Sequence, residues 1–179
     1  MAAYHALNVA SNVTSFSITI SDSMTIVVYS SHTGSTQKYA QAFAEKVGYR
    51  CFSVKEEYDP NEDIIYFGWL RGPSIVDLKL IDRKKLTAVV TVSIEKDRSF
   101  FMKVKESNDV NVPFYNLRGW IDRKKVGLFA KILFVFICAM YKLKGLDDYT
   151  GPMFDAMMNG GSFYNESDLE PLIEFAQSR

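Results

Sequence analysis

Apolar and polar positions follow one another along the chain in blocks that predict strands separated by helices. Five short blocks rich in apolar, β-branched and aromatic residues predict strands, at 26–29, 51–54, 63–67, 86–94 and 112–117. After the first of them, Tyr39, Phe43 and Val47 recur at helical spacing and predict a helix that ends at Gly48. Strands that alternate with helices indicate a parallel sheet with helices on both faces. The sequence therefore predicts an α/β three-layer sandwich with the strand order 2-1-3-4-5.

Further helices are predicted at 97–106 and at the C-terminus. Ser167 followed by Glu170 has the spacing of a capping box, and the residues that would face the core behind it are Leu169, Leu172, Ile173 and Ala176. Residues 1–23 carry no Lys or Arg and no continuous apolar run, so we expect no signal peptide there but a loose N-terminal extension. The folded part is then a single domain, 24–179, that begins at Met24.

The segment that joins the first strand to the first helix is the most informative part of the chain. Five of its seven residues carry hydroxyl groups and one is glycine: Ser30, Ser31, His32, Thr33, Gly34, Ser35 and Thr36. N–H groups at a helix start lack partners and favour an anion, the hydroxyls add donors, and glycine allows the backbone to approach closely. The motifs of triphosphate and dinucleotide loops are absent from the sequence, so a monoester phosphate fits best. The alternatives are a serine-rich turn without a ligand and, for His32, a side chain that faces solvent.

The residues around this turn resemble the phosphate-loop signature of flavodoxins, which hold FMN. The resemblance rests on the strand residues 27–29 and on Ser31, Gly34, Thr36 and Ala40 at their spacing. Phe43 departs from the signature, which usually has a branched aliphatic residue there. The resemblance implies a flavodoxin-like fold and FMN as the cofactor.

Three further segments are expected at the same edge of the sheet, because ligands of such sheets lie at the carboxyl ends of the strands. They contribute the other predicted cofactor-binding residues: Trp69, Leu70, Arg71, Gly72, Ser93, Ile94, Glu95, Arg118 and Gly119. Trp69 lies between two glycines and is placed to stack on the isoalloxazine ring, although a surface Trp that closes a turn is the alternative. Arg71 would stabilise an anionic reduced flavin or bind a substrate carboxylate, and a solvated Arg is its alternative.

The segment Val126 to Tyr141 is apolar nearly all round and lies between the basic run 123–125 and Lys142. A membrane-spanning helix needs ~20 apolar residues, and this segment has fewer and contains Lys131. Three interpretations remain open: a buried helix packed on the sheet, a face that pairs with a second copy of the chain, and a helix that lies on anionic lipid.

The segments 69–72, 92–94 and 116–119, followed by an apolar insertion at about 120–145, resemble one branch of the flavodoxin superfamily. That branch contains the menaquinone-dependent protoporphyrinogen oxidases and related flavodoxin-domain proteins. The resemblance implies an FMN-dependent oxidoreductase that passes electrons from a small organic substrate, such as protoporphyrinogen IX, to a membrane quinone. No residue of the motifs is a compelling acid or base, so no catalytic residue is predicted. The alternative is a flavodoxin-type electron carrier without a substrate of its own.

Composition adjusts this picture only slightly. Lys plus Arg and Asp plus Glu number 21 each, so no overall charge would attract nucleic acid, and flavodoxin-type carriers tend to be strongly acidic. Cys51 and Cys138 are far apart in the sequence and suit a reducing compartment as free thiols. Two histidines cannot build a histidine-rich metal site. We therefore expect a cytoplasmic protein, peripheral at the inner face of the membrane, whose partners are a small molecule or redox protein.

Overall fold

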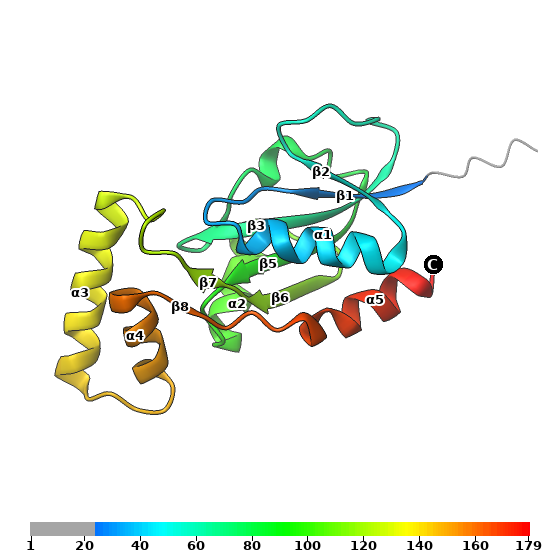
Figure 1. Ribbon diagram of the computed structural model, residues 1–179. Coiled ribbons are helices and arrows are strands. Elements are labelled where there is room, and N and C mark those ends of the chain that lie inside the picture. Colours follow the sequence, from blue (N-terminus) through cyan, green and yellow to red (C-terminus); the bar gives the residue numbers. More distant parts are fainter. Residues whose placement is uncertain (1–23) are drawn as a thin grey trace, which may run out of the picture.

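Five parallel strands form the centre of the protein in the computed structural model, which describes residues 24–179 (Figure 1). They are β1 (Thr25–Tyr29), β2 (Arg50–Ser53), β3 (Asp63–Arg71), β5 (Leu86–Ser93) and β6 (Phe114–Arg118). Their order across the sheet is β2-β1-β3-β5-β6, which confirms the predicted order 2-1-3-4-5. The prediction for residues 1–23 lies outside the described residues.

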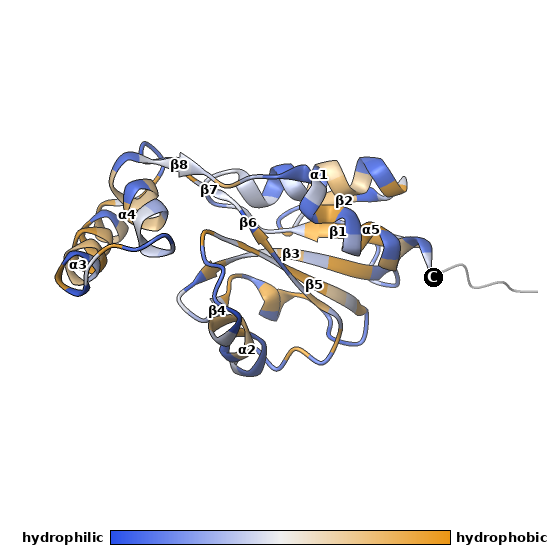
Figure 2. Cartoon of the chain, turned by 90° about the horizontal axis from the view of Figure 1, so that it is seen from below, coloured by the Kyte–Doolittle hydropathy of each residue, from blue (hydrophilic) through white to orange (hydrophobic). Residues whose placement is uncertain are grey.

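Helices cover both faces of this sheet, so the predicted three-layer arrangement is also confirmed (Figures 1 and 2). One face packs against α1 (Ser35–Val47) and α5 (Glu170–Gln177), and the other against α2 (Arg98–Ser107) and the short 3₁₀ helix η1 (Leu78–Leu80). Alternate residues of the strands divide between the two cores: Val27 and Ile65 face α1, whereas Val28 and Ile64 face α2. The predicted inner face of the C-terminal helix is buried as expected.

Strand β3 is longer than the sequence predicted. The segment 68–71 was expected to be a loop, but it continues the strand because β4 (Ser74–Ile75) folds back and pairs with it in antiparallel fashion. Gly72 forms the first position of the two-residue turn with φ +57°, a conformation that glycine adopts without strain. A β-carbon at Gly68 would lie 2.6 Å from Cγ2 of Ile75, so this glycine permits the close return of the hairpin.

The predicted capping box at the C-terminal helix is wrong. Ser167 lies inside a 3₁₀ turn, η2 (Glu166–Leu169), and the Asn165 side chain accepts the Ser167 N–H there. Helix α5 begins only at Glu170, with Pro171 in its first turn. A helix capped by Ser167 would place this proline where its missing N–H would close the first helical hydrogen bond, which explains the later start.

A helical pair is inserted between two short strands, the first of which follows β6. Strands β7 (Trp120–Ile121) and β8 (Gly161–Ser162) pair with each other, and the segment between them forms α3 (Leu128–Lys144) and α4 (Thr150–Asn159). The pair lies beyond the carboxyl ends of the sheet strands, to one side of the three layers (Figures 1 and 2). The segment between β7 and β8 therefore ends at residue 160, further along the chain than the expected 145.

Helix α3 packs on α4 and not on the sheet. Cys138 from α3 is buried against Met153 and Met157 from α4, and it is the one residue of α3 that is buried. Most of the apolar residues of α3 remain exposed on its outer side. Within residues 24–179, no helix is long and apolar enough to cross a membrane.

Candidate functional site

The loop 30–36 leaves β1 and opens α1 in the geometry that suits an anion. Gly34 is the N-cap of the helix with φ +102°, and it offers no side chain to close the first N–H groups of α1. The N–H of Gly34 donates to Oγ of Ser31 at 3.2 Å, which folds the loop back on itself. The first turn of α1 therefore presents backbone donors, and the helix dipole adds a partial positive charge there.

The hydroxyl groups of the loop divide into two sets. Within the described chain, the hydroxyls of Thr33, Ser35 and Thr36 form no hydrogen bond to another protein group; Ser35 and Thr36 are buried, whereas Thr33 is partly exposed and can reach a ligand. Ser30 differs, because its buried hydroxyl donates to Oδ2 of Asp77 at 2.6 Å. Asp77 has φ +61° and lies just after the β3–β4 hairpin, so Ser30 links the loop to the hairpin.

Trp69 and His32 bring the loop and strand β3 together. Their rings are stacked with centroids 5.2 Å apart and planes 23° apart, so His32 faces the tryptophan. The Arg71 guanidinium also lies over Trp69, with its Cζ 5.2 Å from the centroid of the Trp69 ring. Leu70 points to the opposite side of the sheet and packs in the core against α2, and Gly72 forms the tip of the hairpin. Of the four residues predicted here, Trp69 and Arg71 thus lie beside the loop.

The predicted residues at the ends of β5 and β6 hold the inserted helices. Arg118 donates from Nε and Nη2 to the carbonyl of Ile94 at 3.2 and 3.1 Å, and its guanidinium lies 3.8 Å from the Phe163 ring centroid. Glu95 accepts a hydrogen bond from the Tyr149 hydroxyl, and the Ile94 side chain packs between α3 and α4. Ser93 accepts the Glu95 N–H on its own hydroxyl. These groups connect the sheet to the insertion.

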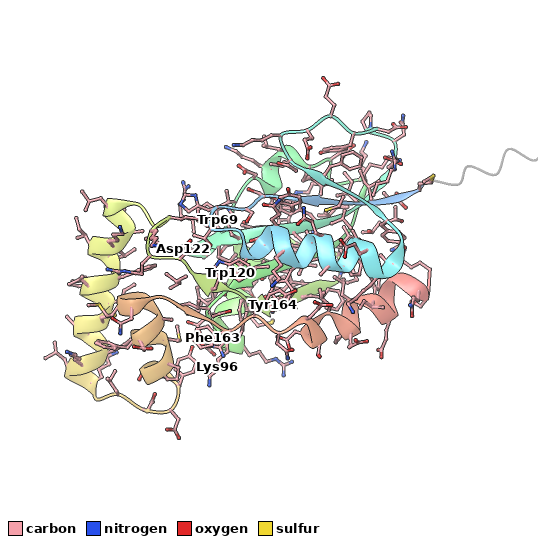
Figure 3. The ribbon with its side chains drawn as sticks, in the orientation of Figure 1. Trp69, Lys96, Trp120, Asp122, Phe163 and Tyr164 are labelled. Carbon is pink, nitrogen blue, oxygen red and sulfur yellow. The ribbon has the colours of Figure 1, made fainter. Side chains whose placement is uncertain are left out.

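Two residues that follow Arg118 lie directly on the loop. A β-carbon at Gly119 would be 2.6 Å from Oγ of Ser35, so Gly119 is packed against the start of α1. Trp120 donates from Nε1 to the carbonyl of Thr33 at 3.2 Å. Trp69, Trp120 and Tyr164 come from three separate segments and gather near the N-terminal end of α1 (Figure 3). Trp120 was not among the predicted site residues, although a tryptophan next to a glycine at a strand end is the same signal that identified Trp69.

A buried tyrosine of α1, Tyr39, holds the end of β6 and the segment after β8 against α1. The hydroxyl of Tyr39 donates to the carbonyl of Arg118 at 2.9 Å and accepts the N–H of Asn165 at 2.9 Å. Burial is the main cause that raises the pKa of Tyr39 from 10.0 to about 12, so the hydroxyl stays neutral. It therefore joins α1, the end of β6 and the segment after β8.

Two pockets border these segments. The first, of about 490 Å³, lies along β7 and β8 and is lined by Trp120 to Lys124 and by Asn159 to Ser162. The second, of about 600 Å³, lies between the β3–β4 hairpin and the end of α2, and its lining includes Arg71, Asp77 and Arg83. Neither of these two pockets is lined by residues of the loop 30–36 or by Trp69.

The loop and Trp69 offer two kinds of group to a ligand, donors for an anion and an aromatic ring. The loop offers uncapped N–H groups and the hydroxyl of Thr33 to a phosphate, and Trp69, on which His32 stacks, places an aromatic ring near the carboxyl end of β3. Lys38 adds a cation from the second turn of α1, with Nζ 4.3 Å from the Tyr164 ring centroid and 5.9 Å from that of Trp120.

Comparison with known proteins gives a limited result. No protein-family model and no curated protein sequence matches the chain. Among solved structures, it is similar to a putative flavoprotein from Bacteroides uniformis ATCC 8492, with 15% identity and a TM-score of 0.38 over 56% of this chain and 93% of that one. It is also similar to a putative flavoprotein from Bacteroides eggerthii DSM 20697, with 12% identity and a TM-score of 0.39 over 70% of this chain and 100% of that one. Both scores are low, so the fold class rests on the strand order and layers described above.

Proposed function

We propose that this protein binds FMN, with the phosphate on the loop 30–36 and the isoalloxazine ring against Trp69. The observation that carries the proposal is the stacking of His32, from the phosphate loop, on Trp69, from β3. It brings a phosphate cradle and an aromatic platform next to each other at the carboxyl ends of two neighbouring strands, where such sheets bind ligands.

In this proposal each residue has a role that its position supports. The first N–H groups of α1 and the partly exposed hydroxyl of Thr33 bind the phosphate. Trp69 holds the ring by its face, and the positive charge of Arg71 beside it favours electron density on the ring. The flavin, when bound, supplies the electron-transfer chemistry, whereas the protein binds and orients it and sets the charge around it.

The exposed side of α3 favours an electron acceptor that lies in a membrane. We define the α3 face by its exposed apolar residues: Leu128, Phe129, Ile132, Leu133, Val135, Phe136, Met140 and Leu143. The cations of residues 123–146, where the sequence has no Asp or Glu, are Arg123, Lys124, Lys125, Lys131, Lys142 and Lys144. An apolar helix face among cations suits an interface with anionic lipid. We therefore propose peripheral binding and electron transfer to a membrane quinone.

The proposed substrate is a porphyrinogen with acidic substituents. The resemblance of the loops to the menaquinone-dependent protoporphyrinogen oxidases favours a porphyrinogen, and the exposed Arg71 offers a guanidinium to an acidic substituent. A flavodoxin-type carrier is the second candidate. The balanced charge and the α3 face argue against it, because a freely diffusing carrier has no use for a large exposed apolar surface.

The absorbance spectrum of the purified protein, before and after FMN is added, tests the proposal. Bound FMN should give a yellow protein that releases FMN on denaturation. Gly34→Val should abolish binding, because valine is strained at φ +102° and its β-carbon would meet the Trp120 ring at 3.5 Å, with the two methyl groups extending beyond it. Gly48→Val is the matched control, since Gly48 has φ +74° at the other end of α1 and nothing lies near its β-carbon position. A colourless wild type that ignores FMN, or a Gly34→Val protein that stays yellow, would overturn the assignment.

Once FMN binding is established, a second measurement separates the enzyme from the carrier. The photoreduced protein is mixed without oxygen with anionic vesicles that contain a menaquinone. A quinone-linked enzyme should be reoxidised rapidly by these vesicles and slowly by vesicles without quinone. Equal rates with both would favour the carrier.

A further inference from the structure

Trp120 contacts the phosphate loop at one peptide unit. Its Nε1 donates to the carbonyl of Thr33 at 3.2 Å, and its Cζ2 would lie 3.5 Å from a β-carbon on Gly34. The edge of the indole therefore lies over the peptide bond that joins Thr33 to Gly34. Trp120 is separated from this bond by more than 80 residues of sequence, so the contact is a product of the fold.

The same peptide unit is held from its other side by the loop itself. The Gly34 N–H donates to Oγ of Ser31 at 3.2 Å. Carbonyl and N–H of a trans peptide point in opposite directions, so the indole and the Ser31 hydroxyl together fix the rotation of its plane. Gly34 is the N-cap of α1, and the rotation of this plane sets the direction of the donors that follow it.

The indole is itself held in place by its neighbours. The Gly119 N–H donates to the carbonyl of Ser93 at 2.8 Å, and the Phe163 N–H donates to the carbonyl of Gly119 at 2.9 Å, which fixes the backbone before Trp120. The Tyr164 ring meets the indole edge to face, with centroids 5.9 Å apart. Such a braced side chain loses little further entropy when it acts on the loop.

We propose that Trp120 is a positioning residue that holds the Thr33–Gly34 peptide in the orientation that directs the following N–H groups of α1 toward the phosphate of the flavin. The inference rests on the proposed FMN function and deepens it. It assigns selectivity for a flavin that carries a phosphate to a residue outside the loop, on the strand that leads to the inserted helices. Trp69 acts on the ring, which FMN and riboflavin share, whereas Trp120 acts on the phosphate end, which riboflavin lacks.

The test compares the dissociation constants of FMN and riboflavin, measured by the quenching of flavin fluorescence, in the wild type and in Trp120→Phe. Phenylalanine retains a ring but lacks the donor for the Thr33 carbonyl. The constant for FMN should rise about fivefold, the effect of one net hydrogen bond, and that for riboflavin should stay within about twofold. The matched control is Trp69→Phe, which should weaken both flavins by a similar factor.

Each outcome of this comparison is informative. An equal loss for the two flavins in Trp120→Phe would overturn the inference, since Trp120 would then act on the whole site, and unchanged constants would overturn it as well. A wild type that binds neither flavin would instead overturn the proposed function. If Trp120→Phe does not fold, Trp69→Phe leaves Trp120 as the sole tryptophan, because the chain has two. Inorganic phosphate should then change its emission, and an unchanged emission would count against the contact.

Discussion

Gly119 lies so close to Ser35 that a β-carbon at position 119 would be 2.6 Å from Oγ of Ser35. It would also be 2.8 Å from Cγ1 of Val92 in the sheet. The backbone that leaves β6 thus passes between the sheet and the first residue of α1. Glycine is required there by packing, and this explains its place in the chain without a direct contact to a cofactor.

Gly119→Ala should therefore lower the free energy of unfolding, by about 1–3 kcal/mol, because an added methyl group must displace Ser35 or Val92. Urea denaturation measures the change. Gly151→Ala is a suitable control, since Gly151 lies in α4 with open space at its β-carbon position, and alanine should be neutral or slightly stabilising there. A Gly119→Ala protein as stable as the wild type would show that Ser35 and Val92 can move apart at no cost in free energy.

Replacement of Trp69 by alanine should weaken flavin binding through the loss of the stacked ring. We expect the dissociation constants of both FMN and riboflavin to rise about tenfold, which corresponds to about 1.4 kcal/mol and to the range measured for aromatic pairs. Flavin fluorescence titration measures both. A loss confined to FMN would place Trp69 at the phosphate and contradict the proposed orientation of the flavin.

Tyr39 should make the protein sensitive to alkaline pH. Its pKa is raised from 10.0 to about 12 in the folded protein, mainly by burial, so the unfolded chain releases this proton first. The unfolded state binds fewer protons between these values, and stability should fall as the pH rises from about 10 to about 12. Urea midpoints across this range test the effect.

The substitution Tyr39→Phe should remove part of this pH dependence while lowering stability at neutral pH. It leaves the carbonyl of Arg118 and the N–H of Asn165 without the hydroxyl, at a cost of about 1–3 kcal/mol. The other buried tyrosines, such as Tyr66, whose pKa burial also raises, should retain the remainder of the slope. An unchanged slope in Tyr39→Phe would assign the alkaline loss to these other groups.

The α3 face should bind anionic vesicles, and the double substitution Phe129→Glu, Phe136→Glu should abolish binding without loss of FMN. These side chains are 81% and 66% exposed, so the change places charge in the interface and leaves the core intact. Leu80→Glu, at an exposed position of η1, is the control for a mutation of an apolar surface residue elsewhere. Vesicle sedimentation and size-exclusion chromatography read the result. A wild-type dimer that the double substitution makes monomeric would identify a second copy as the occupant of this face.

The features that sequence predicted correctly depend on short stretches of chain. The strand order follows from a regular alternation of strands and helices, and the turn at Gly34 from the order strand, small residues, helix. Helix α4 was not predicted because Gly151 and Pro152 at its start resemble a loop. Met153, Ala156 and Met157, which are buried at helical spacing, were the signal that could have identified it.

The candidate site was only partly predictable, because its contacts join distant segments. Ser30, Arg118 and Glu95 have the right residue types at strand ends, but Asp77, the Ile94 carbonyl and Tyr149 respectively occupy their polar groups. A strand-end position gives the edge of the sheet on which a residue lies. It does not give the partner that its side chain meets, which depends on how the inserted helices fold back.

Strands β7 and β8 carry the two chain connections between the inserted helices and the sheet, and Trp120 of β7 contacts the loop that precedes α1. A surface that immobilises the α3 face would therefore also restrain Trp120 and, through it, the Thr33 carbonyl. In the proposed function, a restraint of Trp120 that favours phosphate binding would, by thermodynamic linkage, act in both directions with the same magnitude: the protein loaded with FMN would bind that surface more tightly than the empty one. Flavin binding and binding to the surface would then be coupled equilibria, and the flavin-loaded form would be enriched at the surface.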